Sequence, residues 1–324
     1  MEKFAKVTTA KEWWKQNGLI IVLYALFYIG FNRFVYILAR LITHTIYSPA
    51  DFFDFSMKDI DDKIPLISWT VIPYLLAYIY WLVMPVIVLV FYGKKVFYQL
   101  TFVSFFANIL YFVLIIAVPT KMTLYGPDQV ISQFVVDPSV YPYEFKEGTD
   151  IFTKMLINIV YSNDLPDNLA PSGHVMCTWL IFMACRNKTA KGKYNYWLYT
   201  ITLIYGVWMF FNILTVRQHY IIDGIMSIAL CEICWVLFIK TNFWVFFANG
   251  SDKLSFASAY HHDGYFTSYG KNQNNVYVNH YLKLGKCMTW ILASLFCAIW
   301  VYFLLTSVLG DPFKQFWKWT SFSI

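Results

Sequence analysis

The sequence predicts an all-α integral membrane protein, in which six transmembrane helices form a bundle and an additional transmembrane helix follows near the C-terminus. Two observations support this fold class. Hydrophobic residues make up 59% of the 324 residues and charged residues only 14%, which is too apolar for a soluble domain of this length. The apolar residues also gather into stretches close to the roughly 20 residues that a helix needs to cross a bilayer.

Seven such stretches follow one another along the chain, and the fourth is the shortest. They lie near residues 18–42, 69–92, 96–118, 172–186, 195–215, 221–247 and 287–309. The expected parts of the chain are a cytoplasmic N-terminal segment at 1–17, a six-helix membrane domain at 18–247, a polar cytoplasmic loop at 248–286, an appended transmembrane helix at 287–309 and an outer aromatic tail at 310–324. No cleavable signal is evident, because Met1 to Lys15 is polar and rich in lysine. The first helix is therefore expected to remain as an anchor.

Basic residues gather on one side of this predicted topology. With the amino terminus inside, the inner side carries Lys3, Lys6, Lys11, Lys15, Lys94, Lys95, Arg186, Lys188, Lys191, Lys193, Lys240, Lys253, Lys271, Lys283 and Lys286. The opposite side holds most of the acids, including Asp51, Asp54, Asp59, Asp61 and Asp62. Because cytoplasmic loops carry an excess of lysine and arginine, we expect a multi-pass protein of the cell membrane with a cytoplasmic amino terminus and an outer carboxyl terminus.

The outer loops are expected to contribute short helices at the membrane interface. Residues 43–68 alternate aromatic and acidic residues and are expected to lie along the interface. Their five aspartates indicate a solvated loop rather than a metal site. In the loop at 119–170, apolar residues recur with helical period behind a Thr149 cap, which predicts a short amphipathic helix within 149–161. This helix lies either over the site described below or only over the ends of the bundle.

The cysteines and the remaining histidines indicate neither disulfides nor a metal centre. All six cysteines lie in or at the ends of apolar stretches, so they are expected to pack as small buried side chains. This holds for Cys231 and Cys234, whose redox-like spacing falls inside a predicted membrane helix. The loop histidines His261, His262 and His280 lack the fourth ligand and firm spacing of a zinc site. We therefore expect no metal and no other cofactor.

The stretch Pro171-Ser172-Gly173-His174 stands where a polar loop ends and the fourth apolar stretch begins. Proline suits the first turn of a helix, because the N–H that it lacks would have no partner there. The backbone N–H groups of Ser172, Gly173 and His174 would then form a cradle for an anion, and glycine would allow a phosphate oxygen to approach closely. An imidazole titrates near neutrality, which suits His174 to protonate a departing alkoxide.

A second stretch, Arg217-Gln218-His219-Tyr220-Ile221-Ile222-Asp223, begins the sixth apolar stretch on the same predicted outer side. The spacing of four predicts that His219 and Asp223 share one face of a helix. Asp223 would accept a hydrogen bond from one imidazole nitrogen and leave the other to attack phosphorus, as in a catalytic triad with a phosphohistidine intermediate. Arg217 offers a fork of donors to phosphate oxygens. Because ionisable groups at the membrane edge are usually functional, this pattern favours catalysis over a structural role.

Pro-Ser-Gly-His, followed later by histidine, three residues and aspartate at the start of a helix, resembles the type 2 phosphatidic acid phosphatase superfamily of integral-membrane lipid phosphatases and phosphotransferases. The resemblance covers the six-helix core and leaves the last helix outside it. It implies a helical bundle and metal-independent catalysis, with His219 as nucleophile, Asp223 as its orienting base and His174 as general acid. It also implies that three residues bind phosphate, namely Ser172, Gly173 and Arg217.

Two further likenesses are narrower. His219-Tyr220 followed by Asp223 resembles the His-Tyr-x-x-Asp of sphingomyelin and inositol phosphorylceramide synthases. Asp61-Asp62-Lys63-Ile64-Pro65 with Ile72-Pro73-Tyr74 resembles a pattern in bacterial members of the superfamily.

The cations expected at a phosphate site are incomplete. The family's first motif is a lysine, six residues and Arg-Pro, but the chain has Lys121 and then Gly126-Pro127 without the arginine. In the third motif Ile213 holds the usual arginine position, and Arg217 is the candidate replacement. Arg33, in the first span, either faces the interior and helps to hold an anion or extends to the outer headgroups. A phosphomonoester carries close to two negative charges and a phosphodiester one, so Lys121, Arg217 and Arg33 are few cations for a monoesterase.

Three functions remain open on the sequence. In the first, a lipid phosphatase acts on a lipid of the phosphatidic-acid type, and water attacks the phosphohistidine. In the second, a phosphotransferase passes a headgroup phosphate to a lipid alcohol acceptor. The third is a non-catalytic membrane scaffold that has kept part of the motif set. Both histidines and Asp223 are present, so catalysis on a membrane lipid is preferred, and nothing indicates a nucleic-acid partner.

Overall fold

The computed structural model describes residues 10–48, 51–122, 127–140, 143–161, 167 and 169–240. In this part of the chain the elements are helices, and extended segments meet only in isolated β-bridges. Five described helices are long and apolar enough to cross a membrane, in agreement with the predicted all-α membrane fold. They are Tyr24–Ile46, Ser68–Gly93, Val96–Ala117, Tyr196–Thr215 and Ile221–Ile239. The predicted loop at 248–286, helix at 287–309 and tail at 310–324 lie outside the described residues.

The chain divides into two units, and the site predicted from the sequence belongs to the unit formed by residues 39–239. Of the other unit, the structure describes residues 10–38, which are the N-terminal part of α1 (Ala10–Ile46), and Lys240. The helix α1 contains the first predicted span and extends beyond it at both ends. The side chain of Arg33, one of the expected cations, lies outside the described residues.

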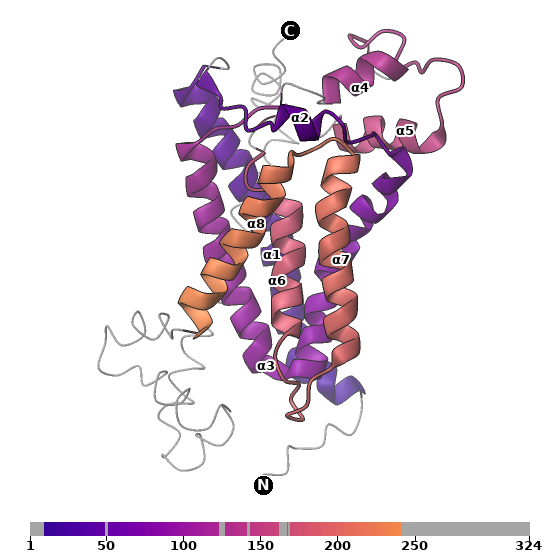
Figure 1. The fold of residues 1–324 in the computed structure, drawn as a ribbon. Coiled ribbons are helices and arrows are strands. Elements are labelled where there is room, and N and C mark those ends of the chain that lie inside the picture. The colour runs from indigo at the N-terminus through magenta and orange to yellow at the C-terminus, as the bar shows by residue number, and fades with distance from the viewer. Residues whose placement is uncertain are drawn as a thin grey trace, which may run out of the picture. The chain divides into compact units, whose positions relative to one another are not determined.

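The second and third predicted spans form one helical run, α3 (Val71–Ala117), which breaks at Gly93. Gly93 has a φ of 79°, a left-handed conformation that glycine adopts readily and other residues rarely do. Figure 1 shows that the two halves of α3 run in opposite directions on either side of the break at Gly93. The loop at 186–195 packs against the break, where the Ala190 N–H donates to the Phe91 carbonyl oxygen at 3.0 Å. The boundary predicted between these two spans is therefore confirmed.

The fourth predicted span is a short core helix, α6 (Gly173–Cys185). Its 13 residues cover about 20 Å at 1.5 Å per residue, less than the ~30 Å of a bilayer core. Figure 1 shows α6 enclosed by α3, α7 and α8, which it also contacts most. A helix that is apolar on all sides is stable when it is buried on all sides, and most α6 residues are buried. The expectation of a full span at 172–186 is corrected accordingly.

The fifth and sixth predicted spans begin where the sequence indicates. The helix α7 (Tyr196–Thr215) is capped by Asn195, whose side chain accepts a hydrogen bond from the Leu198 N–H. The helix α8 (Ile221–Trp235) continues as a π-helical turn, η4 (Val236–Lys240). Residues 241–247 of the predicted sixth span lie outside the described residues. Because α6 and α8 begin at the same end of the unit, the two sequence stretches that precede them meet there (Figure 1).

Short helices gather at this same end (Figure 1). They are α2 (Lys58–Asp61), η2 (Ser68–Thr70), α4 (Pro127–Phe134), α5 (Ile151–Met155) and η3 (Leu156–Tyr161), a π-helical continuation of α5. The helix predicted within 149–161 is present, but its cap is Asp150 rather than Thr149. The Asp150 Oδ1 atom accepts from the N–H groups of Phe152 and Thr153. A carboxylate suits this place because a helix N-terminus carries partial positive charge.

The described cysteines pack as the sequence predicts. Cys177, Cys185, Cys231 and Cys234 are buried, and none of these four forms a disulfide in the described part of the chain. The surroundings of Cys231 and Cys234 differ from those of a redox pair. The Cys231 Sγ instead donates a hydrogen bond of 3.4 Å to the Met176 carbonyl oxygen, where α6 contacts α8. The remaining two, Cys287 and Cys297, lie outside the described residues.

Close packing of α7 against α8 depends on Gly224. A Cβ added at Gly224 would lie 2.6 Å from two ring carbons of Phe210, so we expect Gly224→Ala to destabilise the protein by about 1–3 kcal/mol through overpacking. At Gly206 an added Cβ would lie 3.1 Å from Trp179, and Gly206→Ala should cost less. Thermal unfolding of both variants in detergent checks this order. A Gly224→Ala protein at least as stable as Gly206→Ala would contradict it.

Candidate active site

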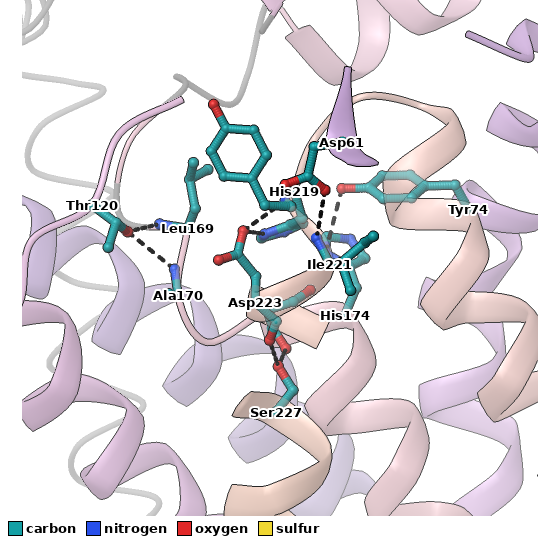
Figure 2. Close-up of polar contacts among 12 residues, drawn as sticks. Asp61, Tyr74, Thr120, Leu169, Ala170, His174, His219, Ile221, Asp223 and Ser227 are labelled. Carbon is teal, nitrogen blue, oxygen red and sulfur yellow. Dashed lines mark hydrogen bonds and ion pairs between the residues drawn. The ribbon is translucent and has the colours of Figure 1, made fainter. Parts of the chain in front are cut away.

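The starts of α6 and α8 are joined by two hydrogen bonds, one to the backbone of Asp223 and one from the side chain of Ser227. The Ser172 N–H donates to the Asp223 carbonyl oxygen at 3.1 Å. The Ser227 hydroxyl reaches the carbonyl oxygens of both Ser172, at 2.9 Å, and Asp223, at 2.7 Å. Figure 2 shows this junction beneath the two histidines. The structure thus brings the two predicted stretches together although 42 residues, 175–216, lie between them in the sequence.

The helix start differs in detail from the prediction. Ser172 is the N-cap of α6 and Gly173 its first residue, so Pro171 precedes the cap instead of occupying the first turn. The Ser172 N–H is also engaged by Asp223, which leaves the N–H groups of Gly173 and His174 as those that a helix start directs outward. A Cβ at Gly173 would lie 3.7 Å from the Tyr111 hydroxyl. This is an ordinary van der Waals distance, so a small side chain would also fit beside this positive helix end.

His219 and Asp223 interact, but not on one face of a helix. The Nδ1 atom of His219 lies 3.3 Å from the Asp223 Oδ2, and both residues are buried, with 9% and 1% of their surface exposed. α8 begins only at Ile221, and His219 precedes the N-cap Tyr220. Asp223 reaches back from the first turn, where its Oδ2 also accepts from the Tyr220 N–H at 2.9 Å. One carboxylate therefore caps α8 and orients the imidazole.

His174 is held by three aromatic residues, of which only Tyr74 was named from the sequence, as part of the pattern that resembles bacterial members of the superfamily. Its ring stacks on Tyr74 with centroids 4.3 Å apart, and Tyr78 and Trp81 contact it at 5.7 and 5.2 Å. The Tyr74 hydroxyl and the His174 Nδ1 share a hydrogen bond of 3.3 Å. These three residues recur at helical spacing on α3. That spacing was the signal in the sequence that they share one face of this helix. Because Nδ1 faces Tyr74, Nε2 is the ring atom left for chemistry.

The two histidines lie within range of each other's charge, at the neighbouring ends of α6 and α8 (Figure 2). Around them, three side-chain atoms are buried without a hydrogen-bond partner in the described part of the chain. These are Ser172 Oγ, His174 Nε2 and Asp223 Oδ1. The large majority of buried polar atoms in proteins are hydrogen-bonded, and exceptions call for an explanation such as an absent ligand. Their occurrence together marks this as a site for a polar group.

Arg217 has an unusual backbone conformation at the end of α7. Its φ is 52°, which is a left-handed conformation. The residue that follows a helix C-terminus often adopts this conformation, and it is usually a glycine. Holding a larger residue in such a conformation costs roughly 1–3 kcal/mol and is typical of functional sites. The Nη2 atom of Arg217 donates to the Ile64 carbonyl oxygen at 3.4 Å. The guanidinium thus lies against the segment that follows α2. In the sequence, Arg217 precedes His219 by two residues.

Lys121 lies earlier in the chain than both stretches of the site, at a backbone junction. Its N–H donates to the Phe53 carbonyl oxygen at 3.0 Å, and its charge acts on the exposed Asp51, whose pKa is lowered mainly by hydrogen bonds from Ser48. The neighbouring Thr120 hydroxyl accepts from the N–H groups of Leu169 and Ala170 at 2.8 and 3.1 Å. The described contacts of this segment therefore position the loop before Ser172 (Figure 2).

Asp61 is the residue for which the sequence interpretation is wrong. Asp51, Asp54, Asp59 and Asp62 are exposed, as expected of a solvated loop, but Asp61 is fully buried with 0% of its surface exposed. Its Oδ2 accepts from the Met57 N–H at 2.7 Å, and its Oδ1 accepts from the Ile221 N–H at 3.2 Å. The available signal was the resemblance of the Asp61–Pro65 stretch to bacterial members of the superfamily. No described group of histidine, cysteine or acidic side chains is arranged to hold a metal ion.

The fold and the site define a class: an all-α membrane protein with a buried histidine–aspartate pair beside a second histidine. Comparisons of the chain with protein-family models, with curated proteins and with solved structures gave no match. The function is therefore argued from the site itself.

Proposed function

We propose that the protein is a metal-independent enzyme that cleaves a lipid phosphoester through a phosphohistidine intermediate, as a lipid phosphatase when water is the acceptor. The observation that carries the proposal is the pair of unpartnered buried atoms that can donate, Ser172 Oγ and His174 Nε2, beside a His219 that Asp223 orients. The oxygens of a bound phosphate could accept hydrogen bonds from the Ser172 hydroxyl and from the His174 Nε2–H. A lipid substrate is supported by the position of the site at one end of apolar helices.

The first step forms a bond between His219 and phosphorus. Asp223 accepts a hydrogen bond from the Nδ1–H of His219, which keeps that proton on Nδ1 and leaves Nε2 as the nucleophile. As Nε2 attacks phosphorus, the bond from phosphorus to the lipid oxygen breaks, and that oxygen takes a proton from His174. Ser172, Gly173 and Arg217 would hold the phosphate oxygens, and Lys121 would add positive charge.

The second step releases the enzyme. His174, now without that proton, takes one from a water molecule, whose oxygen attacks phosphorus. The bond between phosphorus and Nε2 breaks, which returns His219 to its starting state and frees the phosphate. A lipid of the phosphatidic-acid type is the substrate that the superfamily resemblance implies. We place the reaction on the outer face, with a cytoplasmic amino terminus, because of the asymmetric distribution of lysine and arginine.

A headgroup phosphotransferase is the second candidate, and one observation favours it. Asp61 places an additional buried carboxylate at the start of α8, which suits a singly charged phosphodiester better than a doubly charged monoester. In this reaction a lipid alcohol takes the place of water in the second step. His174 would deprotonate the alcohol in the same way.

One assay separates these candidates. Purified protein in liposomes is offered labelled phosphatidic acid, a labelled phosphodiester lipid, and diacylglycerol and ceramide as acceptors. We expect turnover of at least one labelled lipid. Release of inorganic phosphate selects the phosphatase, and transfer of label to an acceptor selects the transferase. Absence of turnover of every lipid would contradict both and leave the non-catalytic scaffold.

A further inference from the structure

Asp61 lies at the catalytic end of α8 although it comes from a different segment. Its carboxylate is fully buried and points at the first backbone N–H of the helix, that of Ile221, at 3.2 Å (Figure 2). The same carboxylate holds the Met57 N–H at 2.7 Å. Ile221 follows His219 by two residues. A negative charge from α2 is thereby placed beside the proposed nucleophile.

The start of α8 is consequently occupied by two carboxylates. Asp223 accepts from the Tyr220 N–H, and Asp61 accepts from the Ile221 N–H. The partial positive charge that a helix N-terminus offers to an anion is neutralised there. At α6, by contrast, the described partner of Ser172 is a backbone carbonyl oxygen. A substrate phosphate would therefore bind at the N-terminus of α6, at Gly173 and His174. The carboxylates of Asp61 and Asp223 would then lie on the opposite side of His219.

At the start of α8, two buried carboxylates, those of Asp61 and Asp223, lie near a single guanidinium. Arg217 supplies one guanidinium, whose Nη2 donates to the Ile64 carbonyl oxygen. On the segment of Asp61 itself, the charged side chains of Lys58, Asp59, Asp62 and Lys63 are exposed, so solvent screens them. The buried Asp61 and Asp223 are screened much less. Each additional negative charge on a bound phosphate is thus repelled.

We infer that Asp61 determines specificity: its carboxylate makes the site select a singly charged phosphodiester headgroup over a doubly charged phosphomonoester. The inference rests on the phosphohistidine chemistry of the proposed function, and for the substrate it favours the phosphodiester of the second candidate over the phosphatidic-acid type of the first. It predicts that preference for the diester grows with pH, as the monoester loses its second proton near pH 6. Comparison of Asp61→Asn with the wild type at the same pH separates the charge of Asp61 from the protonation of the histidines, which both proteins share.

The test compares the full-length wild type with Asp61→Asn and with Asp62→Asn, which removes the same charge from the exposed neighbour. The probes are dihexanoyl phosphatidylcholine and dihexanoyl phosphatidic acid in detergent, at pH 5 and pH 8. For the wild type and Asp62→Asn, we expect the ratio of kcat/KM for diester over monoester to rise with pH. In Asp61→Asn the ratio at pH 8 should fall by about tenfold. An unchanged ratio in Asp61→Asn would overturn the inference.

Binding measurements keep this test separate from the proposed function. In a His219→Ala background neither lipid is turned over, and tryptophan fluorescence can follow the binding of both. We expect Asp61→Asn to lower the diester preference in binding at pH 8 as it does in turnover. Failure of the wild type to turn over either lipid refutes the proposed function, whereas an unchanged binding ratio refutes the role of Asp61.

Discussion

Replacement of His219 by alanine is expected to lower phosphoester turnover by at least about a thousandfold, the size of effect that loss of a nucleophile has in related covalent mechanisms. The fold should survive the change. His219 precedes α8, and the Asp223 carboxylate keeps its 2.9 Å hydrogen bond with the Tyr220 N–H when the imidazole is gone. The measurement is the initial rate on the lipid identified by the liposome assay, with thermal unfolding as the check on folding.

The covalent intermediate provides a second readout of the same variant. A labelled phosphate on histidine is stable to alkali and lost in acid, so rapid quenching in alkali should trap it on the wild type and not on His219→Ala. Asp223→Asn serves as the matched control, because it keeps the nucleophile but not the carboxylate that orients it, and should label slowly. A folded His219→Ala protein with wild-type turnover would remove His219 as nucleophile.

The largest effect on stability is expected at Asp167. Its carboxylate lies 3.3 Å from the Arg40 Nε and 2.7 Å from the His44 Nε2, and Arg40 is 5% exposed. Asp167→Ala leaves a buried guanidinium without its counter-charge, which typically costs about 3–5 kcal/mol. The loss should appear as a lower free energy of unfolding in detergent. It should also slow catalysis, because Asp167 lies just before the segment that leads into Ser172 and the first turn of α6, where His174 lies.

A double variant tests the reason for that effect. Arg40→Met combined with Asp167→Leu removes both charges and fills the space with apolar side chains, which is often close to neutral or stabilising. We therefore expect the double variant to be more stable than Asp167→Ala alone. If Asp167→Ala instead unfolds within about 1 kcal/mol of the wild type, the buried pair contributes little and the explanation is wrong.

The membrane spans could be predicted from the sequence because bilayer thickness and backbone hydrogen bonding leave few alternatives. The break at Gly93 and the starts of α7 and α8 fall where composition indicates. The span at 172–186 could not be judged in this way. The 13-residue apolar helix α6 is buried because other helices surround it. Hydropathy does not distinguish contact with lipid from contact with other helices.

The same division applies to the candidate site. The sequence by itself determined the residue types and their spacing, from Ser172 to His174 and from Arg217 to Asp223, because local patterns at helix starts are short and specific. Only the tertiary structure decided which groups join them. Tyr74 reaches His174 from α3, and Asp61 reaches the first turn of α8 from α2. Whether one aspartate among five is solvated or buried depends on contacts with distant segments, which no local pattern specifies.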